Sequence, residues 1–299
     1  MIFSNQEKLV FRKGYQVIAG IDEVGRGALA GPVAAAVVAI STGRRPPKFQ
    51  RNFSGLLATT GIRDSKLLSA KQREEIFELI KNEPKIEWRV SFVWPKVIDR
   101  INIWQATLLA WQRSLKKLNP QPDFLFLDGK MEMPRLKISQ RPIIKGDQKI
   151  FLLSLASIMA KVSRDRLMER LEKKYPKYGL AQHKGYGTRL HFENLVKIGP
   201  CEIHRKSFRP VFENLPFSEK VYYLVSQIPR GQVMTYQQVA QGIGHPKAYR
   251  AVGNVLNKNR SRQVPCHRVI RSNGQIGGFR EGSHLKEKLL KKEGLTFFR

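Results

Sequence analysis

The sequence predicts two domains, an α/β domain followed by a small, mainly α domain with helix-turn-helix organisation. In the first part, apolar strand patterns that end in acidic residues alternate with helical patterns. In the last part, glycine-containing turns separate short helical segments. With 299 residues, the chain is also longer than one typical domain. We place the domains at residues 1–211 and 212–299, joined by a short connector that is not rich in Gly and Ser.

The α/β domain begins with two strands around a glycine-rich turn. Residues 16–22 alternate apolar side chains toward one face, and residues 33–40 form a nearly all-apolar run suited to full burial. Asp22 and Glu23 fall where the first strand ends. Because adjacent strand residues point to opposite faces, both carboxylates reach one metal site only if the strand distorts or one of them acts through its backbone or a water. The glycines that follow permit such a distortion.

Two further acids occupy positions that are typical of a site. Asp128 follows a four-residue apolar run and precedes a glycine. Asp165 lies on the apolar stripe of a helix predicted over residues 148–174. An acid on a buried face is costly unless it is paired or bound to a metal. For Asp165 alone, the alternative is a salt bridge to Lys161 or Arg164.

The composition points to a polyanionic partner. With 54 Lys+Arg against 24 Asp+Glu, the formal net charge is +30, and a field of this size attracts nucleic acid over long distances. From Pro216 onward, 15 basic and 4 acidic residues give +11, which leaves 39 against 20, or +19, for the remainder. Both domains are therefore basic. A ribosomal or merely cationic protein is the alternative, but carboxylates at the ends of apolar strands argue against it.

Cysteine usage and hydropathy indicate the compartment. Cys201 and Cys266, 65 residues apart, offer no disulfide framework and favour a reducing environment. The longest uncharged apolar run, residues 27–40, is too short to span a bilayer and contains Pro32. The N-terminus lacks a secretory pattern. We therefore expect a cytoplasmic monomer without a membrane partner.

The second domain shows a sequence of short helix, turn and basic helix. Ser218 can cap a helix with one apolar side, Thr235 can cap a second helix, and a third is predicted over residues 247–257. Arg250 of this third helix is expected to face outward. The arrangement is typical of helix-turn-helix proteins, which bind DNA.

Motifs in the first domain resemble those of ribonuclease HII, in the same order along the chain. They are residues 20–27 (GIDEVGRG), 64–66 (DSK), 127–129 (LDG), 145–147 (KGD), 156–165 (ASIMAKVSRD) and 183–188 (HKGYGT), followed by a similar ending over residues 199–208. The resemblance implies a ribonuclease-H-like α/β fold. It also implies cleavage at ribonucleotides in RNA-DNA hybrids or in double-stranded DNA.

The same resemblance implies a two-metal site. Its ligands would be four carboxylates, Asp22, Glu23, Asp128 and Asp165. They would hold two Mg²⁺ or Mn²⁺ ions, one activating water and the other stabilising the leaving 3′-oxygen. Hard oxygen ligands suit these cations, and the first domain has no Cys/His cluster of the zinc type.

The resemblance also indicates which residues would recognise the ribose. The loop of Gly25, Arg26 and Gly27 would sense the ribose 2′-hydroxyl through its backbone, and Tyr186 would pack on the neighbouring sugar. This hydroxyl is what distinguishes an embedded ribonucleotide from the DNA around it.

The roles of four other residues are less specific. Three of them have both a functional and a structural interpretation, and the fourth has a structural one alone. Ser65 and Lys66 are expected to touch phosphate or to position the site, although a Lys after a loop Ser is as often a solvated surface residue. His183 could aid binding or be structural, and Cys201 is expected to be structural.

Near the C-terminus, a thiol stands beside an imidazole at Cys266 and His267. Basic surroundings would lower the pKa of the thiol and favour the thiolate, whereas most free cysteines are inert core residues. The residues alone leave both interpretations open.

Motifs around this pair resemble the C-terminal domain of O6-alkylguanine-DNA alkyltransferase, also called methylated-DNA–protein-cysteine methyltransferase. They are residues 236–240 (YQQVA), 250–254 (RAVGN), Asn259, 265–270 (PCHRVI) and 293–294 (EG). The resemblance implies a small winged helix-turn-helix domain that acts on DNA containing O6-alkylguanine and needs no cofactor. Cys266 would accept the alkyl group, His267 would act as base through a water, and Glu293 would orient the imidazole.

Other residues would serve the flipped guanine. Tyr236 would donate toward guanine N3, Arg250 would fill the gap left in the stack, and Asn259 would hold the active-site turn. The sequence departs from the family pattern at Arg260, where proline is usual, and at Phe279, where tyrosine is common. The segment before the cysteine is one residue shorter than usual, and the nuclease replaces the family's usual N-terminal domain.

We therefore predict a bifunctional DNA-maintenance enzyme, a metal-dependent endonuclease fused to a stoichiometric alkyl acceptor. One alternative keeps the nuclease active and makes the second domain a non-catalytic DNA or lesion anchor. Relatives of that kind carry tryptophan at the position of Cys266, so this cysteine argues against it. Another alternative makes the nuclease half an inactive scaffold, which the retention of four carboxylates argues against.

Overall fold

The structure is a computed structural model that describes residues 3–41, 49–50 and 68–296. It divides into two compact units, Met1–Ser207 and Phe208–Arg299. The boundary lies four residues earlier than the one expected after residue 211. The reason is that α8 (Arg209–Glu213) carries Phe212, which packs against the apolar core of the second unit.

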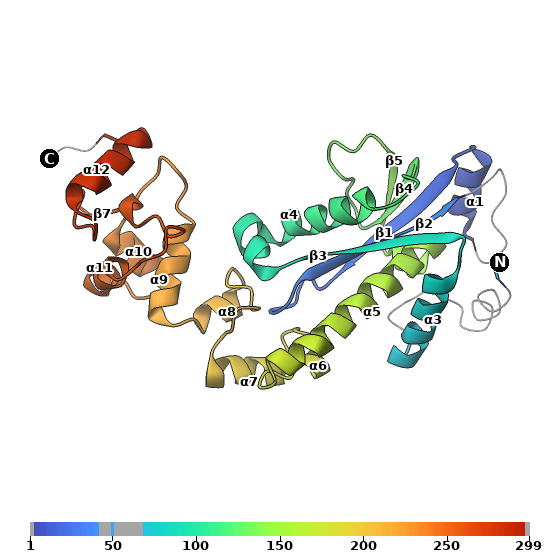
Figure 1. The fold of residues 1–299 in the computed structure, drawn as a ribbon, viewed down its shortest axis with the longest axis horizontal. Helices are drawn as coiled ribbons and strands as arrows, with labels where there is room; N and C mark the ends of the chain where they lie inside the picture. The colour runs from blue at the N-terminus through green and yellow to red at the C-terminus, as the bar shows by residue number, and fades with distance from the viewer. Residues whose placement is uncertain (1–2, 42–48, 51–67, 297–299) are drawn as a thin grey trace. The chain divides into compact units, whose positions relative to one another are not determined.

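The first unit is built on a five-stranded mixed sheet of order β3-β2-β1-β4-β5 (Figure 1). The strands are β1 (Val17–Val24), β2 (Val33–Ser41), β3 (Ile86–Val93), β4 (Phe124–Asp128) and β5 (Ser139–Ile143). β1 pairs with β2 in antiparallel fashion and with β4 in parallel, with Ile21 opposite Leu127. The strand ends that carry Asp22 and Asp128 therefore meet at one edge of the sheet, as expected for parallel neighbours.

Helices cover both faces of this sheet (Figure 1). The helices of this unit are α1 (Asn5–Arg12), α3 (Ala70–Asn82), α4 (Pro95–Lys116), α5 (Phe151–Lys174), α6 (Leu180–His183) and α7 (Arg189–Ile198), with a 3-10 turn η1 (Gly146–Gln148) before α5. α4 packs on β2 and β3, and α5 packs on β1 and β2 from the other side. Gly20 allows this close approach, because a Cβ there would lie 2.6 Å from the backbone of Leu152.

The start of α5 is anchored by a residue from another helix. α5 has no side-chain cap of its own. Instead, the buried carboxylate of Glu7 accepts hydrogen bonds from the backbone N–H groups of Phe151 (3.2 Å) and Leu152 (3.0 Å). These are unpaired donors at a helix N-terminus, where a negative charge is favourable. Burial nevertheless raises the pKa of Glu7.

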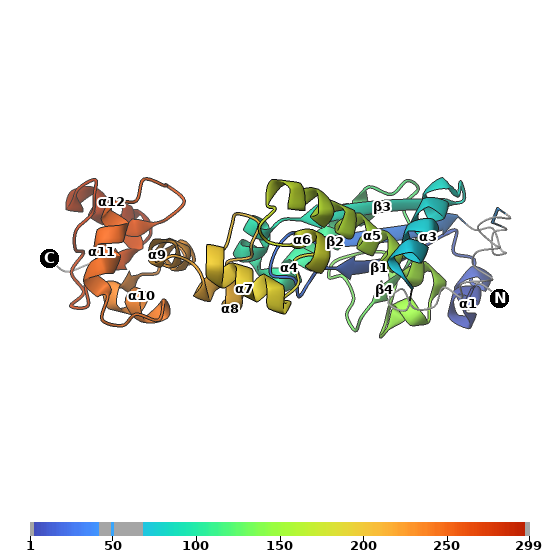
Figure 2. The same cartoon turned by 90° about the horizontal axis from the view of Figure 1, so that it is seen from below.

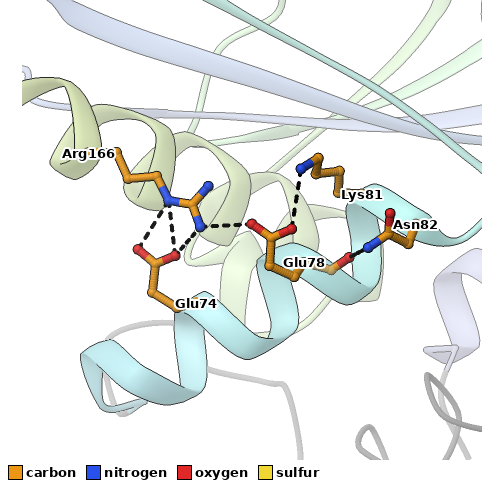
Figure 3. A network of polar contacts seen from close by, with 5 residues as sticks. All are labelled: Glu74, Glu78, Lys81, Asn82 and Arg166. Atoms are coloured by element: carbon orange, nitrogen blue, oxygen red, sulfur yellow. Dashed lines mark hydrogen bonds and ion pairs between the residues drawn. The ribbon is translucent and has the colours of Figure 1, made fainter.

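Arg166 joins α5 to α3, as Figure 3 shows. Its guanidinium contacts the carboxylates of Glu74 and Glu78, the latter at 2.8 Å, and lies 4.4 Å from the centroid of the Phe77 ring. The pair with Glu78 lowers the pKa of that carboxyl. This contact sets the position of α3, which contributes Arg73 to the cavity described below.

The second unit is a helical bundle with one small parallel sheet (Figures 1 and 2). Its elements after α8 are α9 (Phe217–Ser226), β6 (Met234–Thr235), α10 (Tyr236–Gly242), α11 (Tyr249–Asn257), η2 (Cys266–Arg268), β7 (Val269–Ile270) and α12 (Ser283–Lys292). α9, α10 and α11 pack on one another, and β6 pairs with β7. The predicted succession of an α/β domain and a mainly α domain is confirmed.

The predicted helix caps are confirmed in one case and wrong in another. Thr235 accepts a hydrogen bond from the backbone N–H of Gln238 and forms a capping box with it. Ser218 does not cap α9, because that helix begins one residue earlier, at Phe217, directly after Pro216. In the described part of the chain, no helix combines the length and the hydropathy that a bilayer crossing requires.

Candidate active sites

The first candidate site is a cavity of about 290 Å³ at the edge of the sheet where β1 and β4 end. Its lining residues are Asp22, Glu23, Val24, Arg73, Asp128, Ser157, Lys161 and Tyr186. The structure thus brings together three of the four predicted carboxylates. Arg73 is an additional polar residue outside the quoted motifs, and Ser157 lies inside the motif of residues 156–165 but had been assigned no role.

Asp22 and Asp128 face each other across the parallel strand pair. Asp22 is only 5% exposed. Burial raises its pKa well above the usual value, and the negative charges of Glu23 and Asp128 raise it further, against a hydrogen bond from Ser157. Asp128 accepts a hydrogen bond of 2.7 Å from the backbone N–H of Gly146, at the start of η1. Carboxylates held this close repel each other, and a bound cation would relieve the repulsion.

Glu23 contacts the helix on the other face, as the alternation along a strand predicts. Its Oε2 accepts a hydrogen bond of 3.1 Å from the buried indole Nε1 of Trp111 in α4, and its Oε1 lies 3.0 Å from Arg26. Arg26 in turn stacks on Trp104, 5.6 Å from the ring centroid. Burial raises the pKa of Glu23, and Arg26 partly offsets this. Asp22 is held from α5 through Ser157, so two opposing helices position adjacent acids.

Asp165 lies one helical turn from the cavity. Its carboxylate pairs with Lys161 at 3.0 Å, which is one of the two salt bridges considered as alternatives. Lys161 itself lines the cavity. Within residues 3–41, 49–50 and 68–296, no three Asp, Glu, His or Cys side chains are placed to hold one ion. The cavity presents carboxylate oxygens together with the hydroxyls of Ser157 and Tyr186, beside the cationic side chains of Arg73 and Lys161. Its carboxylate oxygens suit Mg²⁺ or Mn²⁺, and the four-ligand site stays a prediction.

Two buried arginines hold the glycine-rich loop between β1 and β2. Arg205 donates to the backbone carbonyls of Gly25 (2.6 Å), Arg26 (2.8 Å) and Gly31 (3.1 Å). Burial lowers its pKa to about 9. Arg164 is also fully buried, and it lies so close to Gly25 that a Cβ there would be 2.2 Å from its Nε. Gly25 also has a φ of +88°, which favours glycine.

Arg164 does not pair with the carboxylate beside it in sequence. Its guanidinium donates to the carbonyls of Pro32 (2.9 Å), Ala30 (3.1 Å) and Lys184 (2.8 Å). The sequence-based reasoning missed this role of Arg164 and Arg205. A signal was available, because both residues lie inside the quoted motifs. The sequence pattern gives neither arginine a contact with solvent or substrate, so a structural role was open to both.

The loop of Gly185 brings Tyr186 to the cavity. The carbonyl of Gly185 accepts from the N–H groups of Leu29 (2.8 Å) and Ala30 (3.2 Å), and a Cβ on Gly185 would lie 2.4 Å from the carbonyl oxygen of Ala30. The Tyr186 ring lies 5.9 Å from the Nζ of Lys161. The glycine-rich loop between β1 and β2 and the segment of Tyr186 are therefore joined by hydrogen bonds.

A buried imidazole chain supports this loop. His183 stacks on His191 at 4.3 Å, His191 Nε2 lies 3.0 Å from His204 Nε2, and the Sγ of Cys201 lies 3.2 Å from His204 Nδ1. Burial lowers the pKa of His191 to about 4 and that of His204 to about 3. In these contacts His183 and Cys201 support the fold. Ser65 and Lys66 lie outside the described residues.

The second candidate site is a cavity of about 1040 Å³ in the second unit. The predicted residues Tyr236, Arg250 and Cys266 line it, together with Phe279 and others. Among the predicted binding residues, Asn259 lies behind the thiol and not in this cavity. Its volume lies just above the range of roughly 300–1,000 Å³ that is usual for small-molecule sites.

Asn259 holds the segment that carries the nucleophile. Its Nδ2 donates to Cys266 Sγ at 3.1 Å and to the carbonyl of Ser261 at 2.9 Å. The thiol is half-buried, and burial raises its pKa, although the bond from Asn259 and the charges of Lys286 and Arg280 lower it in part. The expectation of a lowered thiol pKa is therefore wrong, because desolvation outweighs the basic surroundings.

The imidazole partner is held by a shared carboxylate. His267 Nε2 lies 3.1 Å from Glu293 Oε1. Arg268 also binds Glu293, at 2.9 Å and 2.7 Å. These hydrogen bonds lower the pKa of Glu293 to about 2, and those from Arg268 make the largest contribution. The sequence-based reasoning placed Glu293 correctly beside His267 but missed the bidentate arginine.

Lys286 is a second residue that the motifs did not single out. It is fully buried, and it donates to the carbonyls of Val269 and Gly278, the latter at 3.3 Å. Its Nζ lies 5.6 Å from the ring centroid of Tyr236, whose hydroxyl donates to Gly278 at 3.2 Å. Burial lowers the pKa of Lys286 to about 8. Lys286 and Tyr236 thus fix the turn that faces the thiol.

Comparison with known proteins assigns a family to each part of the chain. A model described as Ribonuclease HII matches residues 19–214, and one described as 6-O-methylguanine DNA methyltransferase, DNA binding domain, matches residues 216–295. The chain is 47% identical over 206 residues to ribonuclease HII of Caldicellulosiruptor bescii, which covers 69% of this chain and 92% of that protein.

Two further likenesses agree with this assignment. Ribonuclease HII of Endomicrobium trichonymphae is 46% identical over 201 residues, covering 67% of this chain and 89% of that protein. The crystal structure of ribonuclease H2 from Pyrococcus horikoshii matches with a TM-score of 0.53 and 26% identity, covering 66% of this chain and 96% of that one.

Proposed function

The chain belongs to the ribonuclease HII family and carries a C-terminal methyltransferase-type DNA-binding domain, and we propose that it has two activities, one in each unit. The first is endonucleolytic cleavage of RNA-DNA hybrids and of duplex DNA that contains ribonucleotides, dependent on Mg²⁺ or Mn²⁺. The second is stoichiometric transfer of alkyl groups from O6-alkylguanine in DNA to Cys266. The high net charge of +30 supports DNA as the common partner.

The observation that supports metal dependence is the crowding of carboxylates in the first cavity. Asp22, Glu23 and Asp128 would hold the cations, with Asp165 as the fourth ligand once Lys161 releases it. Bound there, the cations would activate the attacking water and stabilise the leaving 3′-oxygen. Burial and the neighbouring carboxylates raise the pKa of Asp22, and a bound cation would favour its ionised form.

Recognition of ribose falls to the loop that the two arginines hold. Arg205 occupies the carbonyls of Gly25 and Arg26, so the loop offers its backbone N–H groups to a 2′-hydroxyl. Tyr186 closes the other side of the cavity and would pack on the sugar. A deoxyribose would leave this polar loop without its partner, which explains the preference for a ribonucleotide.

A duplex with one embedded ribonucleotide tests the nuclease proposal. The wild-type protein should cut it with Mg²⁺ or Mn²⁺ and not with EDTA. An intact substrate under all metal conditions would refute the proposal and favour the inactive-scaffold alternative.

The alkyl-transfer proposal rests on the placement of Cys266 at the wall of the cavity of about 1040 Å³, which has room for an extruded base. Because burial keeps this thiol protonated, it needs a base, and His267 is held for that role by Glu293. The thiol proton would pass to His267 through a water while Sγ attacks the alkyl carbon. The S–C bond forms, the C–O6 bond breaks, and the Tyr236 hydroxyl would supply a proton to the leaving guanine.

Transfer of labelled methyl from O6-methylguanine DNA to the protein tests this second proposal. Label should appear on the wild type and be absent from Cys266→Ala. If the wild type binds the lesion but acquires no label, the second unit is a non-catalytic lesion anchor. Label that persists in Cys266→Ala would place the acceptor elsewhere. The cytoplasmic location and the monomeric state stay predictions.

A further inference from the structure

Three histidines of the first unit form a buried group that the proposed cleavage does not use. They are His183 at the end of α6, His191 in α7 and His204 in the segment after α7, and none is more than 6% exposed. Each of their ring nitrogens lies within hydrogen-bond distance of a partner. A buried polar group whose partners are all present is held in one orientation, and it holds the groups that it binds.

The hydrogen bonds of His191 determine which of its nitrogens carries the hydrogen. Nδ1 lies 2.9 Å from the carbonyl oxygen of Tyr186. A carbonyl oxygen only accepts, so Nδ1 carries the hydrogen and donates it. In a neutral imidazole the other nitrogen is then an acceptor. Nε2 of His191 therefore accepts from Nε2 of His204, which lies 3.0 Å away.

The other end of this chain of hydrogen bonds gives the same assignment independently. The backbone N–H of Cys201 donates to Nδ1 of His204 at 3.0 Å, so His204 carries its hydrogen on Nε2, the atom that faces His191. Burial favours the neutral form of both rings, because it lowers the pKa of His191 to about 4 and that of His204 to about 3. The chain thus runs in one direction and ends on the carbonyl of Tyr186.

The segment that contains His204 also holds the glycine-rich loop. The side chain of the next residue, Arg205, donates to the carbonyls of Gly25 and Arg26. Two consecutive residues therefore bind the two structures that would recognise the ribose. One does so through a guanidinium, and the other through an imidazole chain that ends at Tyr186.

The ring of Tyr186 depends on its backbone for its position. It lies 5.3 Å from the guanidinium carbon of Arg164 and 5.9 Å from Nζ of Lys161. Such contacts between a cation and a ring are individually weak. The backbone of Tyr186 is bound on both sides, since its N–H donates to the carbonyl of His183 at 2.9 Å and its carbonyl accepts from His191. A shift of this backbone would carry the ring with it.

Resting on the proposed nuclease activity, we propose that His191 and His204 are positioning residues that hold Tyr186 in place for the sugar of the ribonucleotide. His191 acts through the hydrogen bond of its Nδ1, and His204 keeps the hydrogen on that atom by donating to Nε2. Loss of this bond lowers the rate of cutting, because the rate depends on the placement of the sugar. Affinity for the duplex is retained, since phosphate contacts supply most of it.

A purely structural role of the histidines makes a different prediction. In that case, the loss of His191 impairs cutting whether or not the Tyr186 side chain is present. If His191 acts through Tyr186, its loss has no further effect once the tyrosine ring has been removed. A double-mutant cycle between the two residues measures this difference.

The first test reads the tautomers on the wild type. The full chain is labelled with ¹⁵N-histidine, and the signals of its six histidines are assigned by single substitutions. At pH 7 we expect a hydrogen on Nδ1 of His191 and on Nε2 of His204, with a scalar coupling between the two Nε2 atoms. The opposite tautomer of either ring, or a charged ring, overturns the proposal.

The second test measures cutting of a duplex with one ribonucleotide, with Mn²⁺ and at saturating protein. His191→Leu should slow cutting on the order of 10-fold without a change in the Kd for the duplex. His191→Asn, whose amide can donate to the same carbonyl, should recover most of the rate. In Tyr186→Ala, the addition of His191→Leu should cause no further loss. Leu118→Ala, at a buried apolar position, is the control for lost stability and should leave the rate unchanged.

Each remaining outcome is decisive. Equal slowing by His191→Leu in the wild type and in Tyr186→Ala overturns the positioning role and leaves the nuclease activity standing. A rate in His191→Asn as low as in His191→Leu also overturns it. Because the tautomers are measured on the wild type, the proposal can fail even if His191→Leu does not fold. If the wild type cuts under no metal condition, the nuclease activity itself fails, and the positioning role fails with it.

Discussion

The carboxylates of the two candidate sites have pKa values shifted in opposite directions. In the first unit, Asp22, Glu23 and Asp128 line one cavity, and burial raises the pKa values of Asp22 and Glu23. In the second unit, Glu293 is bound by His267 and Arg268, and its pKa falls to about 2. The first arrangement concentrates negative charge that a cation would neutralise, whereas the second is neutralised by side chains of the chain itself.

The arginines that support the two sites also bind different groups. The nuclease loop is held by buried arginines that bind backbone carbonyls. The thiol site uses its arginine directly on the carboxylate of Glu293. In the first unit, Glu23 also pairs with Arg26 at 3.0 Å, and Asp165 pairs with Lys161. The two sites therefore differ in what their supporting arginines bind, backbone carbonyls around the first cavity and a carboxylate beside the thiol.

The largest expected effect is the loss of one activity while the other is retained. Asp128→Asn removes one carboxylate from the crowded cavity and should reduce cutting on the order of 10³-fold, with methyl transfer unchanged. Cys266→Ser should abolish transfer and leave cutting intact. Both activities are measured on one preparation of each variant. Loss of both activities in either variant would contradict the independence of the sites.

The next effect concerns the support of the nuclease loop. Arg205→Leu removes a donor from three carbonyls and should lower the free energy of unfolding of the first unit by about 3 kcal/mol or more. All four tryptophans belong to this unit, so their fluorescence reports its unfolding alone. Arg189→Leu is the control, because Arg189 is 93% exposed, and its effect should stay within about 0.5 kcal/mol. Equal effects of the two changes would show that Arg205 does not hold the loop.

A pH dependence should also distinguish the units. The pKa values of His191 and His204 are lowered to about 4 and about 3, so their neutral forms stabilise the fold above the ordinary value of 6.5. This stability is lost as the pH falls toward the lowered values, by about 2 kcal/mol for each imidazole between pH 7 and pH 5.

Melting curves followed by tryptophan fluorescence at pH 7.5, 6 and 5 check this prediction. The melting temperature of the first unit should fall over this range. Glu293 remains ionised in the same range, so its contacts in the second unit are retained. A melting temperature that is constant or rises on acidification would contradict the assignment of neutral, buried imidazoles.

Glu293→Gln tests whether the second site depends on its internal ion pair. It should slow methyl transfer by about 10- to 100-fold at pH 7, because His267 loses the charge that makes it a base. The deficit should shrink at higher pH, where the thiol ionises without help. Glu213→Gln, at a side chain 56% exposed, is the matched control. A deficit that does not change with pH would assign Glu293 a purely structural role.

The smallest effect concerns Trp111 and Glu23. Trp111→Phe keeps the aromatic ring but removes the hydrogen bond to Oε2. Mn²⁺ binding should weaken by about 10-fold, as for other residues that orient a metal ligand, and electron paramagnetic resonance of free Mn²⁺ measures it without turnover. Trp94→Phe, at the exposed start of α4, should have no effect. Unchanged Mn²⁺ affinity in Trp111→Phe would show that Glu23 needs no such support.

Much of both sites could be predicted from the sequence by itself. Strand alternation and apolar runs located Asp22, Glu23 and Asp128 at strand ends, and the helical spacing located Asp165. The Thr235 cap and the order of elements in the second unit were also readable. These features depend on residues a few positions apart, whose relative directions follow from the geometry of a strand or a helix.

Only the tertiary structure decided how the sites are held and charged. It placed Arg205 on the carbonyls of Gly25 and Arg26, and it paired Arg268 with Glu293, 25 residues away. It also reversed the expected pKa shift of Cys266, because burial outweighs the basic neighbours. Burial and long-range hydrogen bonds depend on which distant segments meet, and no local pattern contains that information.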